Sequence, residues 1–237
     1  MVIAEAAKRE QAKREQVSRR LAVVPAAAAL LAITTGALLT DKLAGLSAPH
    51  WILGVAAAVF SMPLLGNRLA WRLIVPGLLL ALLPVPPAMH ALCAPLLLGG
   101  AASAVFLMPL MVSSVSPLLR NLIVAAPVLV LLQIVLGAAH RHKAIAVVWH
   151  LAGAMTVAGV MVMLCVVLLR RIAAEKALRL VAGWLIGILV TQVTLGMAAL
   201  LLRMLDMDAT VIAAAHVMGG ALTFAASLML LRATQRS

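Results

Sequence analysis

The residues with the clearest chemical potential are histidines that lie near the start of apolar stretches. His150 and His216 form the best-marked pair, because each follows a short polar break and an apolar run that carries a glutamine and a glycine four residues apart. These preceding residues are Gln133 with Gly137 and Gln192 with Gly196. Two imidazoles can hold one heme iron from opposite sides. The repeated pattern therefore predicts heme between two helices, with His150 and His216 as its axial ligands.

Two alternatives to heme ligation remain open for these histidines. A histidine inside a bilayer is costly unless it is paired or coordinated, and an ordinary hydrogen bond between helices would satisfy it. A zinc site would require four nitrogen, sulfur or carboxylate ligands. The apolar stretches contain no acidic residue, and the two cysteines, Cys93 and Cys165, lie far from the histidines in register. The composition of these stretches therefore favours heme over zinc.

Small residues follow both histidines on the same helix face. Gly153 lies three residues after His150, and Gly219 and Gly220 lie three and four residues after His216. Positions three and four residues apart stack on one side of a helix. We expect these glycines to leave room for a flat macrocycle, although close packing between membrane helices also uses small residues.

Polar residues on the preceding runs could complete such a site. Gln133 and Gln192 could each hydrogen-bond a heme edge or a histidine Nδ1, or they could bridge two helices. Arg141 and Arg203 lie in the polar breaks that follow. They are candidate partners for the heme propionates, and the alternative is that they extend to the membrane surface as interfacial residues do.

A second histidine pair, His50 and His90, occupies the first part of the chain with less support. Gly54 follows His50 by four residues, but no glutamine marks the apolar runs that precede these histidines. They are candidates for a second heme or for a heme that is a substrate.

The composition indicates an all-helical integral membrane protein. Of 237 residues, 65% are hydrophobic and only 11% are charged, and the mean hydropathy is +1.15. No soluble core of this size can bury so much apolar surface. The net charge of +12 does not indicate nucleic-acid binding, because the charges lie at the ends of apolar runs and in one terminal segment. The lipid bilayer is therefore the first predicted partner.

The apolar runs predict eight spans in two halves. The expected organisation is a basic segment over residues 1–20, a first half over 21–112 and a second half over 113–237. The third span is short, so a seven-span arrangement is the alternative. The expected spans are 21–40, 50–66, 70–83, 88–112, 119–139, 144–169, 179–202 and 209–231.

Lysine and arginine placement predicts the orientation. Four of these residues fall in the breaks on the histidine side: Lys42, Arg141, Lys143 and Arg203. The others lie on the side of the chain termini, so both termini are expected to be cytoplasmic in an inner (plasma) membrane. The candidate histidines then lie near the outer face, one on each even-numbered span, as an internal repeat of four helices predicts.

The motifs Gln133-x-x-x-Gly137-Ala-x-x-Arg141-His142 with His150, and Gln192-Val-Thr-Leu-Gly196 with His216, resemble the heme A synthase family. That resemblance implies two pseudo-symmetric four-helix bundles. It assigns His150 and His216 as ligands of heme b, and it assigns the first bundle to heme O. The implied reaction is the oxidation of heme O to heme A for a terminal oxidase. A quinol or another electron donor and oxidase-assembly subunits are the implied partners.

The sequence departs from that family in its first outer loop. The family carries a glutamate there, and often a cysteine pair, whereas residues 41–49 contain neither. The catalytic residues are therefore unassigned, and two other functions remain. One is a non-catalytic b-type cytochrome or heme-bearing subunit of a membrane respiratory complex. The other is a heme-free scaffold or transporter-like bundle.

Overall fold

The described part of the chain is helical throughout, apart from its short connections. A computed structural model describes residues 2–40, 47–65, 68–105, 116–171 and 176–234, and no strand occurs within these ranges. The prediction of an all-α protein is confirmed.

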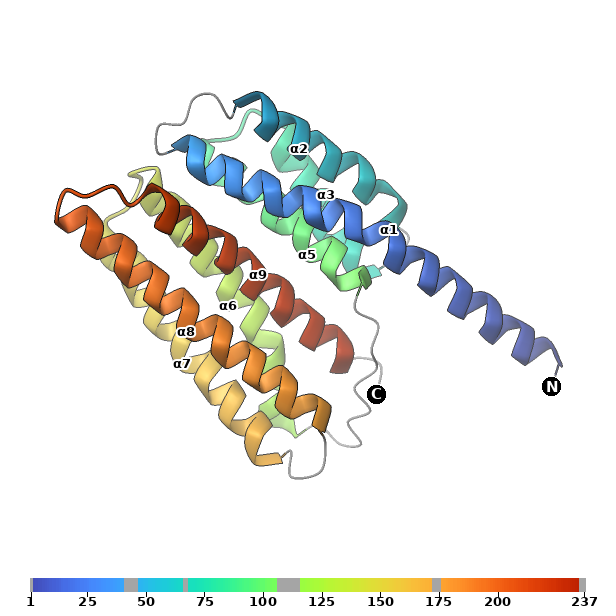
Figure 1. Cartoon of the computed structure of the whole chain (residues 1–237). Coiled ribbons are helices and arrows are strands. Elements are labelled where there is room, and N and C mark those ends of the chain that lie inside the picture. Colours follow the sequence, from blue (N-terminus) through green and yellow to red (C-terminus); the bar gives the residue numbers. More distant parts are fainter. Residues whose placement is uncertain (1, 41–46, 66–67, 106–115, 172–175, 235–237) are drawn as a thin grey trace.

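The first helix joins the basic segment to the first apolar run. Helix α1 (Val2–Thr40) is 39 residues long, and its N-terminal part projects beyond the other helices (Figure 1). Glu5 and Arg9 form an exposed ion pair at 3.3 Å, one turn apart with the acid first, which is the favourable orientation on a helix. The basic segment is therefore a continuation of the first apolar helix.

Shorter helices follow. They are α2 (Ser47–Ser61), the 3-10 helix η2 (Met62–Leu64), α3 (Arg68–Leu82), α4 (Pro87–His90) and α5 (Cys93–Val105). At about 1.5 Å per residue, a helix of 15 residues extends about 22 Å, which is less than the roughly 30 Å of a hydrocarbon core. These helices are apolar but individually too short to cross a typical bilayer unaided.

The helix expected over 88–112 is broken near its start. Helix α4 ends at His90, a turn occupies residues 91–92, and α5 begins at Cys93. Pro95 explains the break, because a proline ring inside a continuous helix would clash with the carbonyl of Ala91. Residues 106–112 of the expected span lie outside the described residues. His90 is therefore at the end of a four-residue helix and not in the first turn of a long one.

The last four helices are long. They are α6 (Pro117–Arg141), α7 (Val147–Arg171), α8 (Lys176–Met204) and α9 (Thr210–Thr234). Among the described residues, five segments are long and apolar enough to cross a membrane: Arg20–Leu38, Pro117–Arg141, Val147–Arg170, Ala182–Met204 and Thr210–Arg232. The protein is therefore membrane-embedded, as its composition predicts.

Helix α9 packs against helices from both the first and the last part of the chain. Its neighbours are α1 and α5, and α6 and α8. Its Phe224 is buried with Leu96 of α5 and Val130 of α6. A Cβ on Gly99 of α5 would lie 2.7 Å from the Phe224 ring, so the glycine permits this close approach. The connections after α6 and α8 lie at the same end of the molecule as the last turn of α1 (Figure 1). Residues at the starts of α2, α7 and α9 are thus brought to one end.

Candidate functional site

The structure brings the four candidate histidines together as two facing pairs. The ring centroids of His150 on α7 and His216 on α9 lie 6.3 Å apart, with their planes inclined at 87°. Those of His50 on α2 and His90 on α4 lie 6.5 Å apart, with their planes at 67°. All four residues are half-buried. Each pair joins two helices, as the repeat of histidines predicts.

These separations suit two imidazoles that share one metal. A metal lies about 2 Å from each ligating nitrogen, and the nitrogen lies roughly 1.1 Å from its ring centroid, so two rings on one axis are about 6.3 Å apart. Heme needs only two protein ligands of this kind, since the porphyrin supplies the others. No group of three or more His, Cys, Asp or Glu suited to a bare metal ion occurs among the described residues. Both pairs therefore fit a bis-histidine heme in their ring spacing.

Three of the histidines are oriented by a backbone carbonyl of the preceding helix. The Nδ1 atom lies 3.0 Å from Ala32 O in His50, 3.1 Å from Gln192 O in His216, and 3.3 Å from Leu80 O in His90. A carbonyl only accepts, so Nδ1 is the donor in each case and Nε2 keeps its lone pair. This tautomer presents the nitrogen that a metal requires, with the other nitrogen held as in known metal sites.

His150 is held differently. Its Nδ1 lies 3.0 Å from the side-chain Nε2 of Gln133, and the same Nε2 donates to the backbone oxygen of His150 at 2.9 Å. The Gln133 Oε1 atom is buried and has no hydrogen-bond partner among the described residues. A side-chain amide NH₂ thus contacts Nδ1 of His150, whereas a main-chain carbonyl contacts Nδ1 of each of the other three.

Glycines on the preceding helices allow three of these rings to pack closely. A Cβ on Gly36, Gly137 or Gly196 would lie 2.8, 3.0 or 2.9 Å from the Cε1 of the neighbouring histidine. The histidines concerned are His50, His150 and His216 respectively. Gly36 has the same place in its helix pair as the two glycines that the sequence motifs contain. Gly36 could have been identified from the sequence as a glycine in the apolar run before a histidine. The number of residues between the glycine and the histidine, however, differs among the three helix pairs.

The glycines after the histidines have a different role from the one expected. We expected Gly153 and Gly219 to leave a bare helix face for a macrocycle. A Cβ on Gly153 would overlap Gln133 Oε1, and one on Gly219 would overlap Gln192 Nε2. The space beside these two glycines is thus filled by glutamine side chains. Gly220 is in ordinary contact with Gln192, whose Oε1 is 3.7 Å from a Cβ built there.

The last turn of α6 adds a third imidazole. His140 stacks on His150, with centroids 6.2 Å apart and planes inclined at 11°. The sequence did not indicate His140 as part of the site, because a position in the polar break says nothing about the direction of the side chain. The pKa of the following His142 is lowered, mainly by burial and also by the charge of Arg141.

Arg141 and Arg203, the two candidate partners for heme propionates, lie in different surroundings. Arg141 donates from Nη2 to the carbonyl oxygen of Ala37 in α1. That carbonyl belongs to the last turn of α1, where helix carbonyls lack intrahelical partners and favour a nearby cation. Arg203 is exposed in the last turn of α8. Arg141 therefore joins α6 to the helix that packs on His50.

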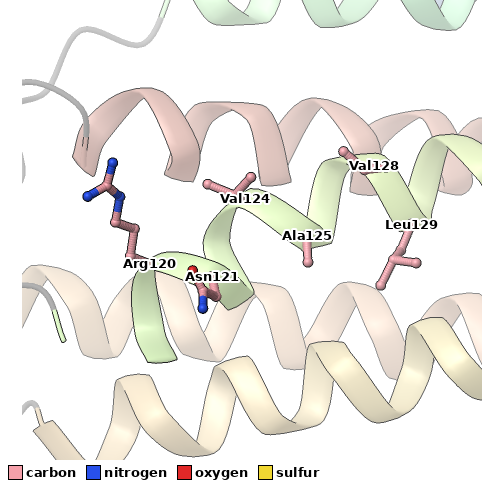
Figure 2. Close-up of a pocket in the computed structure, with 6 residues that line it drawn as sticks. All are labelled: Arg120, Asn121, Val124, Ala125, Val128 and Leu129. Carbon is pink, nitrogen blue, oxygen red and sulfur yellow. The ribbon is translucent and has the colours of Figure 1, made fainter. Parts of the chain in front are cut away.

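Two shallow hollows lie on the described surface, and no residue of the histidine pairs lines either of them. A shallow hollow of about 420 Å³ lies along the first half of α6, and Figure 2 shows the side chains that line it. A second hollow, of about 460 Å³, is lined by residues 143–147 and by His140. The first hollow is lined by Arg120, Asn121, Val124, Ala125, Val128 and Leu129. None of those six belongs to the candidate site.

A comparison of the chain with protein-family models, with curated proteins and with solved structures finds no match.

Proposed function

We propose that this chain is a heme-binding membrane protein of the heme A synthase type. In this proposal His150 and His216 hold heme b as axial ligands. His50 and His90 hold a second heme or the heme substrate. The activity is the oxidation of heme O to heme A during the assembly of a terminal oxidase. The partners are a quinol or another electron donor, together with oxidase-assembly subunits.

The ring spacing of the histidine pairs carries the proposal. The 6.3 Å between His150 and His216 is the separation that one shared iron requires, and the 6.5 Å between His50 and His90 nearly repeats it. In each pair, both rings contact the preceding helix through Nδ1. The Nε2 atom therefore either carries the ring proton or is available to another partner.

The protein's own groups would bind and orient the heme. The carbonyl oxygens of Ala32, Leu80 and Gln192 hold three Nδ1 atoms as donors, and such partners raise the basicity of a ligating imidazole. Heme b, when bound, supplies one-electron oxidation and reduction.

The membrane arrangement belongs to the same proposal. The helices would form eight spans in two four-helix halves, with α4 and α5 together as the fourth. The shorter apolar segments His50–Leu64, Ala70–Leu82 and Pro87–Ser103 would form three of these spans, with the bilayer thinned around them because each is shorter than a typical hydrocarbon core. The bias of lysine and arginine supports cytoplasmic termini in an inner (plasma) membrane, with the histidine pairs near the outer face.

A non-catalytic b-type cytochrome is the second candidate, and one observation favours it. The loop 41–49 contains no glutamate and no cysteine pair, and the two cysteines of the chain are free thiols buried in helices. A protein with this loop could pass electrons through a bis-histidine heme as a subunit of a respiratory complex without oxidising heme O.

Extraction of heme from the purified protein, followed by mass identification, separates the two functions. Heme O or heme A beside heme b is expected from the synthase-type enzyme. Heme b alone, reducible by a quinol, supports the cytochrome. Protein that is folded in detergent and carries no heme of any kind contradicts both.

A further inference from the structure

Gln133 and Gln192 have the same place in two helix pairs but use different atoms. Each lies four residues before the glycine that packs on a histidine of the next helix. Gln192 holds His216 through its main-chain carbonyl, at 3.1 Å. Gln133 contacts His150 through its side-chain amide, at 3.0 Å. A main-chain carbonyl can only accept, whereas an amide side chain has one end that donates and one that accepts.

The direction of the Gln133 amide decides the tautomer of His150. In the orientation found, Nε2 donates to the His150 carbonyl oxygen and faces Nδ1. A second proton of the same NH₂ group then points at Nδ1, which accepts, so the ring proton is on Nε2. A half-turn of the amide would place Oε1 at Nδ1. The ring proton would then move to Nδ1, and Nε2 would have the lone pair that a metal needs.

The orientation found is held by one hydrogen bond, from Gln133 Nε2 to the carbonyl oxygen of His150 at 2.9 Å. In the orientation found, Oε1 is buried without a partner among the described residues, so the half-turn breaks no bond there. The half-turn would break the bond to the His150 carbonyl and bring two acceptor oxygens close together. It therefore requires a new partner for Nε2 of His150 that compensates for this cost. Gly153 provides the space that the amide occupies, because a Cβ there would overlap Oε1.

We infer that Gln133 is a positioning residue that sets which ring nitrogen of His150 faces His216. Without a metal, the amide donates to Nδ1 and His150 presents an N–H. A metal held between the rings would need the Nε2 lone pair of His150, so the Gln133 amide would have to turn and the proton of His150 would be on Nδ1. His216 undergoes no such change, because the Gln192 carbonyl holds it as an Nδ1 donor in both states. This inference rests on the proposed heme site for its second state only.

The tautomers can be measured directly in the full-length chain. With ¹⁵N-histidine label and the protein in lipid bilayers, nitrogen chemical shifts report which ring nitrogen is protonated. Before hemin is added, we expect His150 to be protonated on Nε2, and His50, His90 and His216 on Nδ1. The His150 signal is assigned by its loss in His150→Ala. Protonation of His150 on Nδ1 in the hemin-free wild type would overturn the inference, whether or not heme binds.

Matched substitutions test the functional consequence. Gln133→Leu removes the amide that contacts Nδ1 of His150, and it should weaken hemin binding about tenfold to a hundredfold, as loss of such partners does in metal sites. Thr191→Val removes an exposed hydroxyl that donates to Gly187 O within α8, and it should change hemin binding by less than about threefold. Equal losses in the two variants would contradict a role specific to the Gln133 side chain.

A third variant keeps the test valid if Gln133→Leu fails to fold. In Gln133→Glu the carboxylate only accepts, so His150 should be protonated on Nδ1 even without hemin. The heme should also become harder to reduce, because a more basic ligand favours iron(III). A tenfold shift in that preference is about 59 mV for one electron. A potential and a tautomer that match the wild type would overturn the inference. If the wild type binds no hemin, the proposed function fails and the nitrogen shifts still decide the role of Gln133.

Discussion

The first group of helices, α1 to α5, and the last group, α6 to α9, have nearly the same spacing between their two histidine rings. The helices that carry these histidines differ in length. In the last group, His150 and His216 come from helices of 25 residues each. In the first group, His50 comes from a helix of 15 residues and His90 from a helix of four. The ring centroids are nevertheless almost equally far apart, at 6.3 Å in the last group and 6.5 Å in the first. Helix length is therefore not what determines the spacing.

What the pairs share is the contact of each ring with the preceding helix. Every one of the four Nδ1 atoms meets a polar atom there, and three of the rings pack on a glycine. The first group differs in its surroundings, because Trp51 lies close to both rings, 6.1 Å from His50 and 5.7 Å from His90 between centroids. The histidine pair of the first group thus has nearly the same ring spacing as that of the last group, but a tryptophan lies beside it.

Removing one histidine from each group should give the largest effect and the clearest separation of the two. His150→Ala or His216→Ala should abolish the low-spin heme b spectrum, because one axial ligand is lost. His50→Ala or His90→Ala should leave that spectrum intact and remove any second heme. Absorption spectra and heme content per chain measure both. If the His50 and His90 variants instead remove the only heme, the assignment of the two groups is reversed.

Adding a methyl group at the glycine contacts should have the next largest effect. In Gly196→Ala the new Cβ would lie 2.9 Å from His216 Cε1, and in Gly36→Ala it would lie 2.8 Å from His50 Cε1. Such crowding costs about 1–3 kcal/mol of the free energy of unfolding. Thermal unfolding followed by tryptophan fluorescence measures this loss.

Glycines with open space beside them provide the control for those variants. No described atom lies within 4 Å of a Cβ built on Gly54 or Gly183. Alanine there should be neutral or should stabilise the helix by up to about 1 kcal/mol. A loss in Gly54→Ala as large as that in Gly36→Ala would show that the histidine contact is not the cause.

Arg141 connects the two groups, and its removal should have a smaller effect. Arg141→Gln takes the charged donor from the Ala37 carbonyl at the end of α1. Loss of a cation at a helix C-terminus costs about 0.3–1 kcal/mol. We expect a slightly lower unfolding temperature and little change in the His150 and His216 spectrum. Arg120→Gln, exposed at the other end of α6, is the charge-matched control. An equal change in both variants would argue against the bridge.

The smallest expected effect is a pH dependence from His142. Its pKa is lowered from the usual 6.5, mainly by burial. A histidine with a lower pKa in the folded state takes up a proton more readily when unfolded, so its contribution to stability is present above about pH 6.5 and is lost as the pH falls below it. Unfolding of the wild type and His142→Gln at about pH 7.5 and about pH 5, on either side of that value, measures this. The variant should lose less stability on acidification, and an equal loss would contradict the assignment.

Several features followed from the sequence because they depend on spacing along one helix. The hydrophobic runs predicted an all-helical membrane protein, and Glu5 and Arg9, four residues apart, form the ion pair that this spacing favours. The break at Ala91 was missed, since the apolar run continues through it and only Pro95 indicates an interruption. The expected roles of Gly153 and Gly219 also changed, because a glycine on a helix face does not reveal which neighbour fills the space.

The sequence by itself determined the membrane class of this protein, its helices and the recurrence of glutamine, glycine and histidine. Those properties depend on hydrophobicity and on periodicity within single helices. Only the tertiary structure decided which atom holds each Nδ1, which side chain lies beside each glycine, and that Arg141 reaches α1. These contacts depend on the rotation and the approach of one helix against another. Residues that share a helix face can be found from their spacing, whereas the partner across the interface is determined by packing.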